Sequence, residues 1–122
     1  MRIFKNAWFR RLARRQKITD KALREAVTRA EKGNINADLG GHVIKQRIAR
    51  PGQGKSGGYR TIVIFKKDDK AIFVYGFAKS ERENIDKKET DTFKKAAKQL
   101  LALSDEQIQK LIENGGLTEV KP

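Results

Sequence analysis

Two stretches near the N-terminus carry apolar residues at helical spacing. In residues 6–15 the apolar positions fall on one helical face, and arginines occupy most of the remaining positions. A second stretch runs from residue 19 to residue 32, and Gly33 stops it. Asn6 and either Thr19 or Asp20 can cap these helices through side-chain oxygens. The short link between the stretches predicts an antiparallel helix pair.

Three later stretches have the pattern of strands. Residues 42–50 alternate, with Ile44 and Ile48 on one face and Lys45 and Arg47 on the other. Residues 58–66 are β-branched and apolar on both faces, which is typical of a central strand. A tight polar turn then returns the chain into residues 71–78. Together they predict an antiparallel meander with a long, glycine-rich, basic first loop.

The chain ends carry weaker strand signals. Residues 2–5 alternate briefly and predict an edge strand, and residues 117–120 can add a terminal strand. Residues 34–41 are polar and rich in turn formers, so no strand is predicted there.

Two capping boxes mark helices in the C-terminal third. Asp86 with Glu89 opens one helix, and Ser104 with Gln107 opens a shorter one. The order of elements predicts an α+β fold: an antiparallel sheet, made of the meander plus an edge strand from one or both termini, packed with the N-terminal helix pair and the C-terminal helices. A chain of 122 residues predicts a single domain over residues 1–122.

Positive charge is concentrated in the first half of the chain. Residues 1–62 hold 16 Lys and Arg against 4 Asp and Glu, a net charge of +12, whereas residues 63–122 hold 12 against 11, a net charge of +1. Residues 40–65 alone contain five basic residues and no acidic one. Such an uneven distribution indicates a nucleic-acid partner, and it suits an acidic protein partner equally well.

Several classes of protein are disfavoured by composition. The chain has no cysteine and one histidine, so neither disulfides nor a conventional zinc centre is expected, and no cofactor is predicted. No stretch approaches the roughly 18 apolar residues of a membrane span, and the N-terminus lacks a signal-peptide pattern. We therefore expect a cytoplasmic protein without membrane contact.

Residues 49–56 match a loose phosphate-binding loop pattern. Such a loop needs a helix after it, because the amides of the helix N-terminus hold the phosphates. Here the following residues, 58–66, have strand character instead. The match is read as fortuitous, although the glycine-rich loop could still contact a nucleic-acid backbone through its amides.

The basic residues of the meander could carry out RNA cleavage without a metal. That reaction needs a base for the 2′-hydroxyl, stabilisation of negative charge at phosphorus, and a proton for the leaving oxygen. Lysine amines at positions 45, 55 and 79 could transfer protons, whereas Arg47 and Arg60 suit the phosphate because arginine stays charged. Tyr59 and Tyr75 could stack on a base or relay a proton.

Other residues have simpler interpretations. The arginines of the first helix are read as a solvated face rather than an RNA-binding ridge. Trp8 is read as a core anchor rather than a stacking platform, and His42 as a surface polar residue.

Three motifs together resemble a known family. They are Gly40-Gly41 followed by Lys45-x-Arg47-Ile-Ala, then Gly-x-Gly-Lys-x-Gly-Gly-x-Arg60, then Tyr75-Gly-x-x-Lys79-x-Glu81. This combination resembles the RelE-type toxins of bacterial toxin–antitoxin pairs, most closely the HigB-like branch. The resemblance implies a compact antiparallel sheet with helices packed on it, and a ribosome-dependent endoribonuclease that cuts mRNA without a metal. It also implies a cognate antitoxin, and operator DNA as a partner of the toxin–antitoxin complex.

The resemblance also assigns roles to residues. By motif, the catalytic group is Lys45, Arg47, Arg60 and Lys79, and the RNA contacts are Arg50, Lys55 and Arg82, with Tyr59 and Tyr75 as candidate stacking residues. The chain departs from the best-known RelE pattern because no tyrosine or histidine follows Tyr75. The identity of the general base therefore stays open.

Two other functions remain compatible with the sequence. The same charge would serve a nucleic-acid-binding module without catalysis. The related ParE branch acts on gyrase instead of RNA, and fold alone does not decide between these activities.

Overall fold

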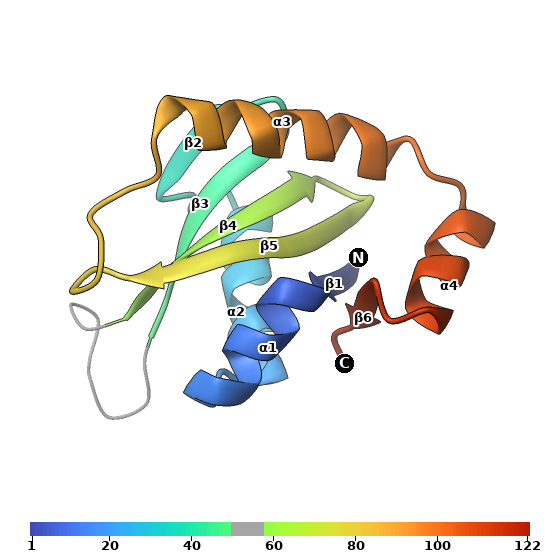
Figure 1. The fold of residues 1–122 in the computed structure, drawn as a ribbon, viewed down its shortest axis with the longest axis horizontal. Coiled ribbons are helices and arrows are strands. Elements are labelled where there is room, and N and C mark those ends of the chain that lie inside the picture. Colours follow the sequence, from blue (N-terminus) through green and yellow to red (C-terminus); the bar gives the residue numbers. More distant parts are fainter. Residues whose placement is uncertain (50–57) are drawn as a thin grey trace.

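The predicted α+β fold is confirmed by the computed structural model, which describes residues 1–49 and 58–122. Four helices and a six-stranded sheet account for the described chain (Figure 1). The elements, in chain order, are β1 (Arg2–Asn6), α1 (Ala7–Gln16), α2 (Asp20–Glu31), β2 (Ala37–Gly40), β3 (Val43–Ile48), β4 (Tyr59–Lys66), β5 (Lys70–Ala78), α3 (Lys87–Leu101), α4 (Asp105–Glu113) and β6 (Leu117–Glu119). Within the described residues, none of the helices has the length and apolar character that crossing a membrane requires.

The strand order is β2-β3-β4-β5-β1-β6, and the predicted meander β3-β4-β5 forms its antiparallel centre. The predicted terminal strand is confirmed as β6, which closes one edge of the sheet. The N-terminal strand is not the edge strand that was predicted. β1 pairs in parallel with β5 and antiparallel with β6, so it lies inside the sheet. The polar stretch 34–41 also contains a short edge strand, β2, which the turn-rich composition concealed.

Helices cover both faces of the sheet. α1 and α2 lie on one face, and α3 runs across the other (Figure 1). Each face has its own hydrophobic cluster, and β4 contributes to both of them: Val63 and Phe65 to the first, Ile62 and Ile64 to the second. Burial of β4 on both sides explains why its sequence is apolar at successive positions rather than at alternate ones.

Helix starts are set by local side-chain caps, as predicted. The side chains of Asn6 and Thr19 accept hydrogen bonds from the third residue after each of them, and both predicted capping boxes are complete. Asn6 has a second role because its amide nitrogen donates to the Val74 carbonyl at 3.1 Å. The residue that caps the start of α1 is thereby attached to β5.

One buried polar side chain joins three segments of the first core. Gln46 on β3 is 1% exposed, and its amide donates to the carbonyls of Ala26 in α2 (3.0 Å) and Asn34 (3.1 Å). Its oxygen accepts from the Asn36 amide at 2.9 Å. The bond to Ala26 is buried and the other two are partly buried, so the glutamine ties α2 and the segment before β2 to β3.

Replacing Gln46 with leucine keeps the side-chain volume and removes the three hydrogen bonds. We expect the free energy of unfolding to fall by about 1–3 kcal/mol, because the buried bond to Ala26 and the two partly buried bonds are all lost. Urea unfolding followed by circular dichroism measures the change. Gln99→Leu on the exposed side of α3 is the matched control and should change stability by less than about 0.5 kcal/mol. Equal effects of the two substitutions would contradict the role given to Gln46.

Candidate active site

Two of the predicted cations share one face of β3. Ile44 and Ile48 belong to the cluster beneath α1 and α2, so Lys45 and Arg47 lie on the α3 face, as the alternation predicted. The Lys45 ammonium donates to the Asn84 side-chain oxygen at 3.3 Å. Asn84 lies in the segment that leads into α3, so this bond holds the lysine at one side of the sheet face.

Arg60 on β4 continues this cationic group. Its Cα is paired with that of Arg47 on β3 and with that of Phe77 on β5. Residues directly opposite one another in antiparallel strands project to the same face. Arg47, Arg60 and Phe77 therefore form a row across three strands, and Lys45 lies two residues from Arg47 on the same face.

Arg60 is unusual because it is a charged residue in the interior. It is 8% exposed, and its Nη1 atom has no hydrogen-bond partner in the part of the chain that the structure describes. A buried donor without a partner costs on the order of 1–3 kcal/mol, and more when it carries charge. The fold thus holds a guanidinium nitrogen that an anion could satisfy.

Three further residues of the predicted site are Lys79, Arg50 and Lys55. Lys79 is exposed in the turn directly after β5, at the end of the sheet where β4 begins. No described contact joins it to Lys45, Arg47 or Arg60. Arg50 and Lys55, predicted as RNA contacts, lie outside the described residues.

Arg82 is held by protein groups rather than presented as a free cation. Its guanidinium forms a two-pronged ion pair with Glu89, with distances of 2.6 and 3.0 Å, and Nη1 also donates to the Tyr75 hydroxyl at 3.1 Å. The guanidinium carbon lies over the Phe77 ring, 5.6 Å from its centroid. The hydrogen bonds that Arg82 donates to Glu89 and Tyr75 raise the pKa of Arg82, and the bonds that Glu89 accepts from Arg82 and the Asp86 backbone amide lower the pKa of Glu89. Of the three cations predicted as RNA contacts, Arg82 is therefore the one whose charge is neutralised by Glu89.

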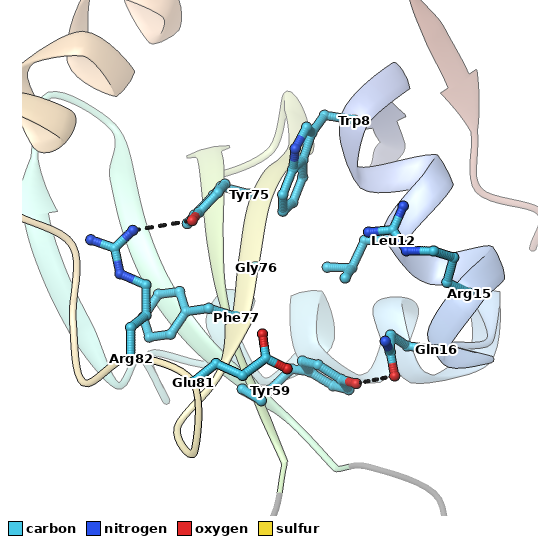
Figure 2. A pocket seen from close by; sticks show the side chains of 11 residues that line it. Trp8, Leu12, Arg15, Gln16, Tyr59, Tyr75, Gly76, Phe77, Glu81 and Arg82 are labelled. Atoms are coloured by element: carbon cyan, nitrogen blue, oxygen red, sulfur yellow. Dashed lines mark hydrogen bonds between the residues drawn. The ribbon is translucent and has the colours of Figure 1, made fainter.

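The aromatic residues gather around a cleft at the end of β5. Trp8 stacks on Tyr75 with ring centroids 4.6 Å apart and ring planes inclined by 29°. A cleft of about 270 Å³ opens beside them, and Figure 2 shows the lining side chains converging from α1, from β5 and from the segment after β5. Trp8 is 36% exposed, so the prediction that it is a core anchor is wrong. Its ring stacks on Tyr75 beside the cleft and belongs to neither hydrophobic cluster.

Tyr59 was predicted as a candidate for stacking on a base, but its side chain is buried. Its side chain is 1% exposed, packs in the cluster beneath α1 and α2, and donates its hydroxyl proton to Gln16 at 2.5 Å. It forms the inner wall of the cleft, where its face cannot take up a base. Tyr75 is half-buried and keeps one side of its ring close to the cleft (Figure 2).

Sequence reasoning missed Gln16, Asn84 and Glu89 as neighbours of the site. Glu89 was identified only as part of a capping box, and nothing in the local pattern of Gln16 or Asn84 indicates a long-range contact. Their positions depend on how the helices pack against the sheet. The four arginines of α1, at positions 10, 11, 14 and 15, are exposed, as the prediction of a solvated face requires.

Comparison with known protein families agrees with the observed fold. The family model described as the RelE toxin of the RelE/RelB toxin–antitoxin system matches residues 1–120. The chain belongs to the RelE toxin family. No curated protein matches it. As a RelE-family toxin it has a cognate antitoxin as its protein partner, which agrees with an uneven positive charge that an acidic segment could neutralise.

The ion pair between Arg82 and Glu89 predicts a specific dependence of stability on pH. Glu89 has a lowered pKa in the folded protein, so its contribution to stability is complete above the ordinary glutamate pKa and is lost as the pH falls through the folded value. We therefore expect Glu89→Gln to be less stable than wild type at neutral pH. The difference should shrink in acid, as urea unfolding between about pH 7 and pH 3 would measure.

Glu83→Gln is the control, because Glu83 is an exposed glutamate in the same connecting segment. It should change the free energy of unfolding by less than about 0.5 kcal/mol at neutral pH. A Glu89→Gln deficit that stays constant across the pH range would rule out the proposed linkage.

Proposed function

We propose that this RelE-family toxin is a ribosome-dependent endoribonuclease that cleaves mRNA and thereby inhibits translation. The observation that carries the proposal is the buried Arg60 guanidinium, which lies opposite Arg47 and has one nitrogen, Nη1, without a partner among residues 1–49 and 58–122. An RNA phosphate is an anion that can accept from two guanidinium groups at once. The family to which the chain belongs supports RNA rather than another polyanion as the substrate.

In the proposed reaction the RNA 2′-oxygen attacks the adjacent phosphorus, and the bond from phosphorus to the 5′-oxygen of the next nucleotide breaks. Negative charge grows on the non-bridging oxygens, where Arg47 and Arg60 would stabilise it. Because Arg60 is largely shielded from water, solvent would screen its interaction with that charge only weakly.

Two proton transfers complete the reaction: the 2′-hydroxyl loses a proton, and the leaving 5′-oxygen gains one. Lys45 is suited to one of these transfers because the Asn84 bond keeps its amine at the side of the phosphate site. Lys79, in the turn after β5, is the candidate for the other. The proposed partners are accordingly mRNA and the ribosome, with operator DNA bound through the complex with the antitoxin.

The decisive variant is Arg60→Met, which replaces the buried cation with an apolar side chain of similar length. We expect stability to be unchanged or increased, because a poorly satisfied buried charge is removed. Cleavage should fall by about 100-fold or more, as it does when one preorganised donor to a developing oxyanion is lost. Mapping of mRNA 5′ ends on purified ribosomes measures cleavage, and urea unfolding measures stability.

Lys66→Met is the matched control, since Lys66 is an exposed cation at the far end of the same strand. It should leave cleavage unchanged. Full cleavage by folded Arg60→Met would overturn the assignment of the site. If the wild-type protein binds RNA without creating new 5′ ends, it is a non-catalytic binding module, and DNA damage with intact mRNA would indicate a gyrase-directed toxin.

A further inference from the structure

The cleft beside α1 has features that phosphate binding alone does not require. Trp8 and Met1 are the large apolar side chains that lie exposed in the described part of the chain, and Trp8 forms the rim of this cleft. An aromatic ring that stays in contact with water at the mouth of a cleft is available to stack on a flat ligand.

The stacking surface is held rigidly. Tyr75 contacts Trp8 on one side and lies 5.8 Å, centroid to centroid, from the Phe93 ring of α3. Its hydroxyl accepts a hydrogen bond from Arg82, which Glu89 holds in turn. Tyr75 therefore cannot turn away from Trp8 without breaking this network, so little ordering would be needed when a ligand binds.

The size and charge of the cleft favour a neutral ring over a phosphate. Its volume of about 270 Å³ lies below the roughly 300–1,000 Å³ of sites for drug-sized ligands, which suits one flat ring system. Among the described residues, two arginines and one glutamate line the cleft. Arg82 is already paired with Glu89. The Glu81 carboxylate, which Figure 2 shows turned toward the middle of the cleft, offsets the charge of Arg15. A carboxylate repels a phosphate, whereas it accepts hydrogen bonds from the amino group of a base.

The cleft also lies beside the proposed phosphate site. Phe77 lines the cleft and has its Cα paired with that of Arg60, so the two sites meet where β4 and β5 are adjacent. A strand of RNA with a phosphate at Arg60 would carry a neighbouring base to this edge of the sheet.

We propose that the cleft binds one unstacked nucleobase of single-stranded RNA, with Trp8 as the stacking surface. This inference rests on the proposed function for its RNA substrate, and it adds a base-binding subsite to the phosphate-binding cations. Recognition is by the π-face of the base, and the carboxylate of Glu81 lies within the cleft as an acceptor for an amino group.

Trp8 is the single tryptophan of the chain, so its fluorescence reports on the cleft directly. The test uses a 2′-O-methylated hexaribonucleotide, which cannot be cleaved, and a hexamer of the same charge that lacks all its bases. The base-bearing oligomer should change Trp8 fluorescence to saturation and protect Trp8 from quenching by acrylamide. The abasic oligomer should bind more weakly and leave both signals unchanged.

Substitution at position 8 separates stacking from charge. Trp8→Leu should weaken binding of the base-bearing hexamer, measured by anisotropy of a labelled oligomer, by about 5- to 150-fold. Trp8→Phe should retain most of the affinity because it keeps an aromatic face, and neither variant should alter binding of the abasic hexamer. Equal binding of both oligomers to wild type, or binding of the base-bearing hexamer without any change at Trp8, would overturn the proposal.

These outcomes are independent of cleavage. If the base-bearing oligomer protects Trp8 of the wild-type protein but mRNA stays intact on ribosomes, the base-binding subsite is supported and the proposed nuclease activity is rejected. If the protein cleaves mRNA while Trp8 stays unprotected, the nuclease activity is supported and the base-binding subsite is rejected.

Discussion

The structure depends on the burial of β4 on both of its faces. A strand in the centre of a sheet with apolar side chains on both sides must be covered by two separate layers. The chain meets this requirement with segments from its two ends, because α1 and α2 cover one face and α3 covers the other. β1 and β6, also from the two ends of the chain, extend the sheet beyond β5.

Arg60 is the exception within this apolar strand, and the candidate site follows from it. The same strand carries Ile62 and Ile64 on the α3 face, both buried. Arg60 lies on this same face and carries a guanidinium instead of an apolar side chain. It is buried, although one of its nitrogens has no hydrogen-bond partner among the described residues. A stable core gains nothing from such a group, and residues of this kind are typical of sites where function takes precedence over stability.

The end of β5 brings two different chemical surfaces together. On the α3 face lies the cationic row that contains Arg47 and Arg60, and around the free edge of β5 lies the aromatic cleft. Arg82 lines this cleft, and its ion pair with Glu89 removes positive charge from the aromatic side. The phosphate would therefore contact cationic side chains, and the base would contact aromatic ones. In RNA-binding proteins, phosphate contacts usually position the strand and base contacts recognise it.

Local patterns in the sequence determined the helices, their caps, the meander, and the shared face of Lys45 and Arg47, because helical and strand periodicity and capping act over a few residues. Only the tertiary structure decided which segments and side chains that are distant in the sequence contact one another. It placed β1 inside the sheet, left Trp8 exposed, buried Tyr59, and paired Arg82 with Glu89. Each of these outcomes depends on which distant segments pair or pack, and a residue's own neighbours in sequence carry no information about a partner that only folding brings near.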